Sequence, residues 1–424
     1  MSLSYRTKII IDRTLGIIVV VLLNGLTRLV GIILRRNHGP AHKPKVIVVA
    51  KYLGLGSIVY TGALCHALKR RFPDTQLVYL TMRGCQNFVQ RLPSVDYVLT
   101  IDDSNMVRMV LTTVLSLFRL WRLRPELFFD MEVYSSWSAI IATLSLARNR
   151  YGFFRKSVVF KKGLHSHLIY FNTARHIAQI YAQMALAADC RVEDILLETP
   201  RIESCEEKEA DKILAELQLT DRPLVLINPN ASELMLERRW STQNWIEFLH
   251  HVAPSGQWYF LLVGSPNERT YVSSIFEQLN SETKRYVANV AGQFSLGGYL
   301  ALIKKATCIV TCDSGPLHFS IVLGTPSLSL WGPGDPRHYG LLNSNRHMII
   351  YRDIYCSPCL YHADYPPCGG NNQCMKQISV EECVQAFEAL TNVKIKDRLP
   401  KQDVHSHGFD VLPVANDIYG LVAR

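Results

Sequence analysis

The amino-acid sequence predicts an α/β protein made of two doubly wound domains in tandem, with a hydrophobic helix in front of them. Short apolar runs of strand length alternate with helix-length segments, a charged segment interrupts this alternation, and the alternation then starts again. Such alternation is typical of a mostly parallel sheet with helices on both faces. The 424 residues suffice for two or three domains.

Composition supports a folded protein with an anionic partner. Hydrophobic residues make up 48% and charged residues 19% of the chain, which excludes wholesale disorder. The net charge of +10 suits a membrane surface, a phosphate-rich substrate or a nucleic acid. The basic residues are dispersed and no recognition module is visible, so we expect no nucleic-acid partner. Eleven cysteines in a chain of this length indicate a reducing compartment and not a disulfide scaffold.

The amino-terminal segment is apolar enough to meet a membrane. Residues 15–34 form a run that is just long enough to span a bilayer. A helix would place Asn24, Thr27, Arg28, Gly31 and Arg35 on one face, and a charge in lipid costs roughly 2.5–3.5 kcal/mol. We therefore expect a helix in the interface of an anionic leaflet, where Arg28 reaches headgroups and the basic flanks also contribute. A single span and a helix buried in the protein are the alternatives.

The first series of strands and helices follows residues 38–40, and the second follows a charged helix expected at 203–217. Strands are expected at 45–50, 75–81, 97–101 and 127–132, and then at 224–228, 258–263, 308–311 and 327–331. Intervening helices include 59–72 and 135–146, and a last helix covers 380–390. The predicted domains are a membrane-associated segment at 1–40, domains at 41–202 and 203–394, and a tail at 395–424. Ligands in such sheets bind at the carboxyl ends of strands, and we expect the active site in the cleft between the domains.

A glycine turn follows the first strand. Gly54 and Gly56 precede Ser57 and a helical segment. As a dinucleotide fingerprint the run is poor, because Val59 occupies the third glycine position. We interpret it as a turn that lets the backbone approach a substrate.

The most informative run is residues 311–318, where a hydrophobic strand ends and a helix with proline in its first turn begins. Helix N-termini present free N–H groups and a positive dipole to anions. Ser314 and Gly315 can therefore offer donors to a diphosphate. The alternative is an ordinary capping turn in which Asp313 is the N-cap.

Other polar residues follow strand ends in the same domain. Asn228 ends the strand at 224–228, and Arg238 follows in its loop, where a guanidinium suits phosphate oxygens or forms part of a solvated surface pair. Glu268 follows the strand at 258–263 and either accepts from ribose hydroxyls or caps a helix.

Six motifs in order resemble those of glycosyltransferase family 9, the ADP-heptose:lipopolysaccharide heptosyltransferases: NPNAS, RRW, VGSPNE, AGQFSL, TCDSGPLHFSIVLGTP and WGPGDP. The resemblance runs from about residue 45 to about residue 390. It implies a GT-B fold of two Rossmann-like domains facing a cleft, and an inverting, metal-independent transfer of a heptose or related sugar from a nucleotide-diphosphate donor. It also implies a lipid-linked glycan or lipopolysaccharide core as acceptor, and a peripheral or monotopic enzyme on the cytoplasmic face of the bacterial inner membrane. No cofactor is expected for transfer.

The resemblance assigns roles around the donor. It implies that Asp313 contacts the donor's sugar, that Ser314 and Gly315 bind its diphosphate, and that His318 lies nearby. Arg238 falls where the family often has lysine beside the phosphates, and it keeps the charge.

The same resemblance places three further residues around the nucleoside. Glu268 would hold the ribose, and Gln293 and Phe294 would lie near the base. Asn228, at the end of the first strand of this domain, completes the predicted donor site.

The acceptor side departs from the family. Family members commonly have Gly-Asp in the first glycine loop, with the aspartate as candidate base, whereas this chain has Gly56-Ser57. Ser57 needs an activating partner to act as a base at neutral pH. Asp130 and Glu132, at the end of the strand predicted at 127–132, offer carboxylates instead. We hypothesise that Glu132, which lies further out, takes the acceptor proton. The alternative is that one of the two caps the following helix.

Four cysteines, Cys356, Cys359, Cys368 and Cys374, fall within nineteen residues. They allow a structural zinc ion, a disulfide or free thiols, and the spacing lacks the second C-x2-C pair of many zinc sites.

Two other functions share this architecture. A nucleotide-sugar epimerase would release sugar product without an acceptor. A non-catalytic, membrane-bound sugar-nucleotide binding protein would bind donor without turnover, and the missing loop aspartate keeps this reading open.

Overall fold

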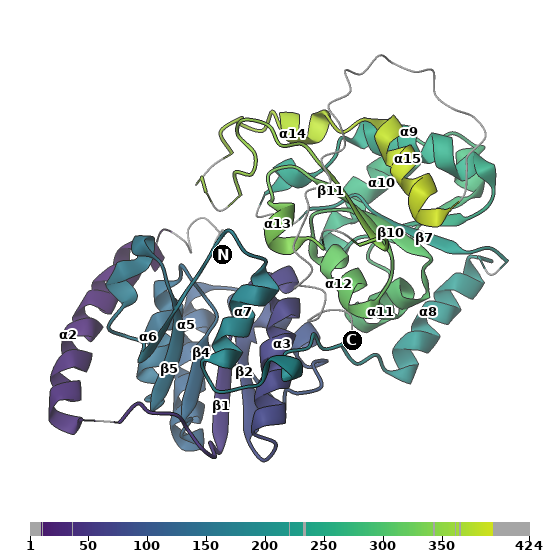
Figure 1. Cartoon of the computed structure of the whole chain (residues 1–424). Coiled ribbons are helices and arrows are strands. Elements are labelled where there is room, and N and C mark those ends of the chain that lie inside the picture. Colours follow the sequence, from purple (N-terminus) through teal and green to yellow (C-terminus); the bar gives the residue numbers. More distant parts are fainter. Residues whose placement is uncertain are drawn as a thin grey trace. The chain divides into compact units, whose positions relative to one another are not determined.

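The computed structural model divides the chain into two compact units, an amino-terminal unit up to Arg201 and a carboxy-terminal unit from Ile202 (Figure 1). The structure describes residues 10, 12–35, 37–219, 221–231, 235–341, 344–360, 362–363 and 366–392. The tail predicted at 395–424 lies outside the described residues.

The sheet of the amino-terminal unit has six strands in the order β3-β2-β1-β4-β5-β6, and every neighbouring pair is parallel. The chain adds β2 and β3 on one side of β1 and then returns to place β4 on its other side, so the direction of growth reverses between β1 and β4. Ligands bind at such a reversal in open α/β sheets. The strands are β1 Val46–Ala50, β2 Gln76–Met82, β3 Tyr97–Ile101, β4 Leu127–Asp130, β5 Asn149–Phe154 and β6 His167–Tyr170.

Helices cover both faces of this sheet, as right-handed crossovers require. Helices α5 and α6 pack on one face, over a core that includes Val48, Phe128 and Ile141. Helices α3 and α7 pack together. The principal helices are α3 Leu55–Arg71, α5 Met106–Leu123, α6 Ser136–Leu144 and α7 Ile177–Leu186, with the shorter α4 Gln86–Val89.

The predicted hydrophobic helix is present as a π-helical turn, Asp12–Gly16, followed by α2, Ile17–Leu34. Together they form a helix long and apolar enough to cross a membrane, with only 6% of its apolar window buried. The Asp12 carboxylate accepts hydrogen bonds from the backbone N–H groups of Ser136 (2.9 Å) and Trp137 (2.7 Å). These bonds attach the start of the segment to the first turn of α6.

Part of the predicted polar stripe of α2 faces the protein. Thr27 Oγ1 donates to the carbonyl of Gly163 at 3.4 Å, and Asn24 Nδ2 donates to the carbonyl of Phe160. The other three positions of the stripe, Arg28, Gly31 and Arg35, are exposed. Most of the large apolar side chains of α2 also point outward, because these two polar groups find partners in the backbone of residues 160–163.

The carboxy-terminal unit repeats the same topology, with the order β12-β11-β10-β7-β8-β9 and only parallel pairs. The reversal here lies between β7 and β10. Its strands are β7 Leu224–Asn228, β8 Tyr259–Leu262, β9 Val287–Asn289, β10 Cys308–Cys312, β11 Ser327–Trp331 and β12 His347–Tyr351. Its helices are α8 Ser204–Glu216, α9 Thr242–Val252, α10 Arg269–Glu277, α11 Leu296–Lys305, α12 Gly315–Leu323, α13 Pro336–Tyr339, α14 Gln373–Lys376 and α15 Val380–Thr391.

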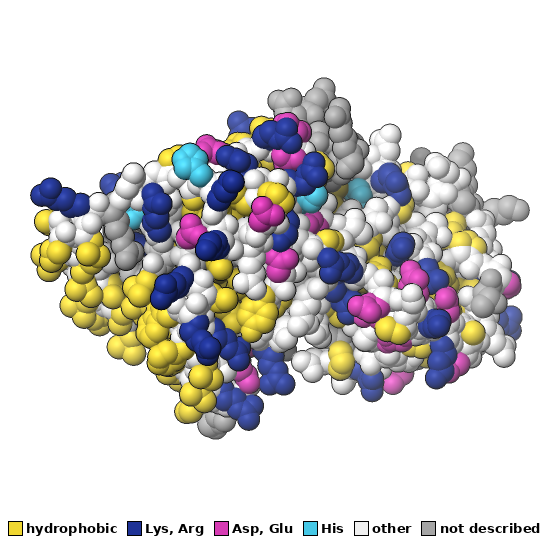
Figure 2. Space-filling view, turned by 90° about the horizontal axis from the view of Figure 1, so that it is seen from below, with side chains coloured by type: hydrophobic (Ala, Val, Ile, Leu, Met, Phe, Trp, Pro, Cys, Tyr) yellow, Lys and Arg dark blue, Asp and Glu magenta, His cyan; other side chains and the backbone are white. Residues whose placement is uncertain are grey.

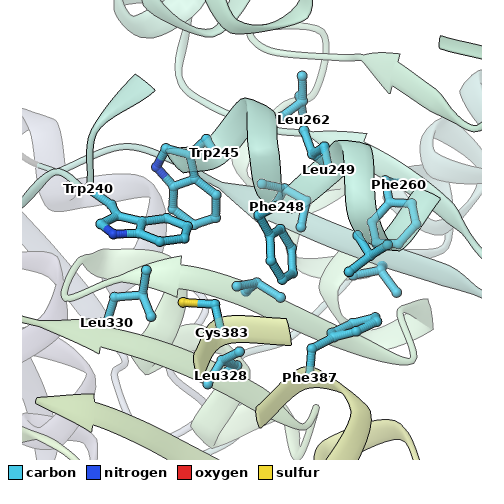
Figure 3. Close-up of a cluster of buried hydrophobic side chains, with 14 of the residues drawn as sticks. Trp240, Trp245, Phe248, Leu249, Phe260, Leu262, Leu328, Leu330, Cys383 and Phe387 are labelled. Atoms are coloured by element: carbon cyan, nitrogen blue, oxygen red, sulfur yellow. The ribbon is translucent and has the colours of Figure 1, made fainter. Parts of the chain in front are cut away.

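An aromatic core under α9 and α15 fixes the loop that follows β7. Figure 3 shows Trp240, Trp245, Phe248 and Phe387 in one cluster, with Trp240 and Trp245 in edge contact at 5.1 Å between centroids. The indole of Trp240 is buried and donates to the carbonyl of Ile378 at 3.0 Å. Burial of such a side chain stabilises by a few kcal/mol, about 1.5–3 for large apolar groups. Trp240 thereby holds in place the chain segment that carries Arg238.

Candidate functional site

The predicted donor residues meet where β10 gives way to α12. All five residues of β10 are buried, and the backbone N–H of Asp313 continues the ladder by donating to the carbonyl of Leu330 at 3.1 Å. Ser314 has an extended backbone and is the N-cap of α12, so the alternative that Asp313 is the N-cap is wrong. Gly315 and Pro316 begin α12. Proline has no N–H and the N–H of Leu317 donates to the carbonyl of Ser314 at 3.2 Å, so Gly315 provides the N–H in this turn that can meet an anion.

Asp313 and Arg238 form a buried ion pair at this helix end. Arg238 Nη1 lies 3.4 Å from Asp313 Oδ2, and the two side chains are 10% and 7% exposed. Burial raises the pKa of Asp313, and the Arg238 guanidinium opposes that rise. Arg238 therefore lies beside the α12 N-terminus, as the donor-site prediction requires, and brings a positive charge to the same point as the helix dipole.

His318 lies one helical turn further on, with Nε2 4.0 Å from Asp313 Oδ1. Burial, reinforced by the nearby positive charge of Arg238, lowers its pKa to about 3. The imidazole is therefore neutral at pH 7. It can donate or accept a hydrogen bond at the sugar-diphosphate position, but it adds no charge.

Asn228 belongs to a buried network of side-chain hydrogen bonds at the reversal between β7 and β10. Its Nδ2 donates to Thr311 Oγ1 and to Ser314 Oγ, both at 2.9 Å. Asn230 Nδ2 donates to Asn228 Oδ1 at 3.1 Å, while the buried Asn230 Oδ1 has no partner among the described residues. Asn228 thus orients Ser314, and Asn230, which the sequence analysis did not select, leaves an acceptor at the edge of the site. The sequence feature that could have identified Asn230 is the Asn-Pro-Asn triplet that follows a buried strand.

Gly334 is a second residue that the sequence analysis did not select. A β-carbon at this position would lie 2.3 Å from Asp313 Oδ2 and 3.3 Å from an aromatic carbon of Trp331. Any side chain there would displace the Asp313 carboxylate. The signal was the loop WGPGDP, which directly follows β11, the neighbour of β10.

The predicted nucleoside residues lie at the ends of β8 and β9. Glu268 Oε2 accepts from the backbone N–H of Ser265 at 2.7 Å in a capping box, so the capping alternative holds for one of its oxygens. A β-carbon on Gly264 would lie 3.3 Å from Glu268 Cβ and 2.9 Å from Asn230 Nδ2, which brings Glu268 to the edge of the asparagine network.

Gln293 and Phe294 follow β9, close to the turn that carries Glu268. The N–H of Gly292 donates to the carbonyl of Gly264 at 2.8 Å, and Gln293 Nε2 donates to the carbonyl of Asn289 at 3.1 Å. Gln293 is exposed and Phe294 half-buried. Glu268, Gln293 and Phe294 therefore form one group around the Gly264–Gly292 contact, next to the asparagine network.

The second set of predicted residues lies at the reversal between β1 and β4 in the amino-terminal unit. Lys51 Nζ contacts Glu132 Oε1 at 2.7 Å, and the N–H of Tyr52 donates to the same oxygen at 3.0 Å. The Glu132 side chain is 18% exposed, and within the described part of the chain no hydrogen bond is found to its Oε2. One carboxylate oxygen is thus anchored, and the side chain remains partly exposed.

Asp130 has a different environment from Glu132. Its side chain is fully buried, and its carboxylate meets His165 Nε2 at 3.0 Å, the backbone N–H of Glu132 at 3.1 Å and the hydroxyl of Ser138. Burial alone would raise the pKa of Asp130, but Lys161 and the His165 hydrogen bond outweigh it and hold the pKa below its usual value. Asp130 is an internal anchor that acceptor hydroxyls cannot reach.

The structure corrects two premises about these carboxylates. Strand β4 ends at Asp130 and not at residue 132 as predicted, so Glu132 lies beyond the strand. Neither caps α6, because Ser135 is the N-cap and Asp12 accepts the next two N–H groups.

Buried basic groups beside them were missed by the sequence analysis. Lys161 is 1% exposed and donates to the carbonyls of Glu132 and Val133, at 3.2 and 3.1 Å. Lys51 follows β1, whereas Lys161 and His165 both lie in the connection between β5 and β6, and no local spacing marks any of them as a neighbour of Glu132.

The predicted glycine turn is present, and the helix after it begins earlier than predicted. Gly54 is the N-cap of α3 with φ +84°, a conformation that favours glycine. Gly56 and Ser57 lie in the first turn, where Ser57 Oγ donates to the carbonyl of Gly54 at 2.8 Å. No carboxylate or imidazole that would activate the Ser57 hydroxyl is found bonded to it within the described residues.

The four clustered cysteines surround one small cavity of about 110 Å³, together with Pro333, Tyr355 and Asn371. All eleven cysteines of the chain have free thiols in the structure. Burial raises the pKa of Cys374 to about 11, with the other cysteines adding to the rise. Across the described residues, no group of three or more His, Cys, Asp and Glu side chains is arranged to hold a metal ion. The predicted zinc option therefore gains no support from the geometry.

Comparison with known proteins connects these observations to a family. Residues 133–367 match the sequence model of glycosyltransferase family 9 (heptosyltransferase). Lipooligosaccharide heptosyltransferase 2 from Haemophilus influenzae is 24% identical over 311 residues, which cover 70% of this chain and 85% of that protein. Lipopolysaccharide heptosyltransferase 2 from Salmonella typhimurium is 32% identical over 117 residues, or 28% of this chain and 33% of that protein. The latter match thus spans only a third of that relative.

Solved structures support the fold. A glycosyltransferase family 9 protein from Veillonella parvula superposes with a TM-score of 0.70 at 18% identity, covering 84% of this chain and 99% of that one. The E. coli ADP-heptose LPS heptosyltransferase II superposes with a TM-score of 0.66 at 19% identity, covering 82% and 98%. The two parallel six-stranded sheets are those of the GT-B fold, as predicted.

Proposed function

This chain belongs to glycosyltransferase family 9, and from that premise we propose that it transfers a heptose from ADP-heptose to a lipopolysaccharide core acceptor. The observation that carries the proposal is the buried Asp313–Arg238 pair at the N-terminus of α12. It places a carboxylate and a guanidinium where a sugar diphosphate would meet the positive end of the helix dipole and the N–H of Gly315.

The donor site supplies what departure of a nucleoside diphosphate needs. Negative charge grows on the leaving diphosphate as the sugar bond breaks, and preorganised donors stabilise such charge. Arg238 and the N–H of Gly315 at the start of α12 would take this role, with Ser314 oriented by Asn228. We therefore propose that transfer is metal-independent. Direct attack of the acceptor hydroxyl on the donor sugar would then invert the anomeric centre.

On the acceptor side we propose Glu132 as the base. The acceptor hydroxyl loses its proton as it attacks, and a carboxylate within hydrogen-bond reach is the usual recipient. Glu132 offers a partly exposed carboxylate with Oε1 held by Lys51 and Tyr52, whereas the Asp130 carboxylate is enclosed.

The hydrophobic helix supports a location on the membrane. The outward-facing apolar side of α2 leaves most of its large side chains in contact with solvent unless a bilayer covers them. We propose that α2 docks the enzyme as a monotopic protein on the cytoplasmic face of the bacterial inner membrane, where the lipid acceptor is available.

The test is a reconstituted reaction with ADP-heptose and lipopolysaccharide that lacks core heptose, run with and without EDTA. We expect ADP release and an acceptor heavier by one heptose, with little effect of EDTA. Conversion of ADP-heptose without acceptor would instead indicate an epimerase, and binding without turnover on any lipid acceptor would indicate a binding protein.

Arg238→Ala should weaken ADP-heptose binding by about 1.5–3 kcal/mol, since a charge-assisted hydrogen bond is lost. Calorimetric titration measures this change. Arg285→Ala is the matched control, because Arg285 is exposed on the same unit and lies outside the donor group. Equal donor affinity in both variants would remove Arg238 from the site.

A further inference from the structure

A second apolar surface of the amino-terminal unit, separate from α2, lies on α5. Helix α5 exposes an apolar stripe at helical spacing, while Thr113 and Ser116 lie on its buried face. A surface helix normally turns its apolar side to the core. The stripe consists of Val107 (77% exposed), Val110 (46%), Leu111 (56%), Val114 (42%), Leu115 (48%), Phe118 (53%) and Trp121 (41%).

The stripe and α2 belong to the same side of the molecule. Helix α6 packs against α2, and Trp121 Nε1 of α5 donates to the carbonyl of Leu144, the last residue of α6, at 2.7 Å. Both α5 and α6 cover the same face of the sheet. Figure 2 shows hydrophobic side chains gathered over this part of the amino-terminal unit, with Lys and Arg side chains among them.

A cavity of about 510 Å³ opens at the end of the stripe, which is within the size range of ligand pockets. It lies near the amino-terminal ends of β4 and β5, the edge of the sheet opposite to Glu132. Its lining combines two exposed apolar side chains, Trp121 and Leu146, with the side chains of Arg124, Arg148 and Asn37.

No acidic side chain among the described residues of the cavity lining neutralises the two arginines. The guanidinium of Arg124 makes no hydrogen bond or ion pair with any described residue, and Arg148 uses Nε to donate to the carbonyl of Asn37 at 2.7 Å. Glu126, the acidic residue nearest to Arg124 in sequence, accepts a hydrogen bond from the backbone N–H of Lys45 at 2.7 Å. No acidic residue lines the cavity.

We propose that this cavity binds the anionic headgroup of a phospholipid while the α5 stripe enters the acyl region of the same leaflet. The phosphodiester of a headgroup with net negative charge would accept hydrogen bonds from the guanidinium groups of Arg124 and Arg148, whereas the phosphate of phosphatidylcholine is already neutralised by its own ammonium group. The indole of Trp121 would lie at the boundary, the position tryptophan prefers at membrane interfaces.

Charge argues for a lipid leaflet over a second copy of the chain. Helices α2 and α5 contain no Asp or Glu, whereas α5 carries Arg108, Arg119 and Arg122. A twofold contact would place this basic surface against itself. An anionic leaflet attracts it, by about 1 kcal/mol for each basic residue near the surface.

The test compares vesicles of phosphatidylglycerol and phosphatidylethanolamine with vesicles of phosphatidylcholine, using the full chain. Because α2 also binds membranes, the readout is the preference for anionic vesicles. We expect Arg124→Gln to lower binding to anionic vesicles about fivefold and to leave binding to phosphatidylcholine unchanged. Arg285→Gln, with the same charge change on the other unit, should match wild type. Wild-type preference in the Arg124→Gln variant would overturn the proposal.

A second measurement does not depend on the arginines. Lipids brominated in the acyl chains should quench part of the tryptophan fluorescence, and Trp121→Phe should remove that part while its thermal unfolding stays that of wild type. Quenching that persists in Trp121→Phe would overturn the proposal, as would a stable dimer in vesicle-free solution that masks Trp121. Donor binding is unaffected in either case, so this result is independent of the proposed transfer reaction.

Discussion

Glu132 and Asp130 are two residues apart, yet they have opposite environments. The Asp130 carboxylate is enclosed by His165 and Ser138, while Glu132 keeps one oxygen free of described partners. A catalytic base must be accessible to its substrate, whereas a carboxylate that holds internal hydrogen bonds must be shielded from solvent and substrate. Burial therefore separates their roles more clearly than their spacing does.

We expect Glu132→Gln to lower the turnover number severely and to leave ADP-heptose affinity intact, because only the acceptor proton loses its recipient. Steady-state rates and calorimetric titration of the donor measure the two effects. Asp130→Asn is the contrasting variant: it should lower the free energy of unfolding by about 1–3 kcal/mol, since buried donors lose their charged acceptor. Full activity of Glu132→Gln would exclude Glu132 as the base.

At the scale of elements, α2 and α6 depend on each other. The Asp12 carboxylate meets the first N–H groups of α6, and the polar side chains of α2 bond to the backbone of residues 160–163. The hydrophobic segment is therefore part of the amino-terminal unit and not a detached anchor.

Removing residues 1–42 should weaken membrane binding, because the α5 surface remains, and should leave donor binding intact, because the donor residues all lie in the carboxy-terminal unit. The truncation also removes Asp12, so it should lower the stability of the amino-terminal unit. Asp12→Ala in the full chain isolates the contribution of Asp12 to stability. We expect this variant to lower the free energy of unfolding by about 0.5–2 kcal/mol, the usual cost of losing a helix cap. Membrane fractionation and urea unfolding measure the two effects. Truncated protein that stays membrane-bound as fully as wild type would show that α2 is not the principal anchor.

At the scale of the whole molecule, the buried His318 and the half-buried His347 make stability depend on pH. Burial lowers the pKa of His318 to about 3 and that of His347 to about 4, with nearby arginines adding to each shift. In the unfolded chain both titrate near 6.5. Below pH 6.5 the unfolded state therefore binds more protons than the folded state, and stability falls as the pH is lowered.

Between pH 7 and pH 5 we expect each of these two histidines to lower the free energy of unfolding by about 1–2 kcal/mol. Urea midpoints at the two pH values measure the sum. His347→Asn should reduce the loss, because it removes one titrating group that lies apart from the donor residues. A variant with the same pH dependence as wild type would show that His347 does not contribute.

Much of the architecture followed from local pattern. Apolar runs such as 224–228 and 327–331 predicted strands with the observed ends, because parallel strands buried on both faces are nearly uniformly apolar. Strands β5, β6, β9 and β12 were missed. These strands are short or mix polar with apolar residues. They are stabilised by pairing with neighbouring strands rather than by their own strand propensity.

The sequence by itself determined the fold class, the family and the donor motif, because strand–helix alternation and the residues around a helix N-terminus are contiguous in the chain. Only the tertiary structure decided which carboxylate is accessible, that Gly334 makes room for Asp313, and which side of α2 faces outward. These features depend on contacts between segments far apart in sequence, and burial and hydrogen-bond partners arise only when those segments pack.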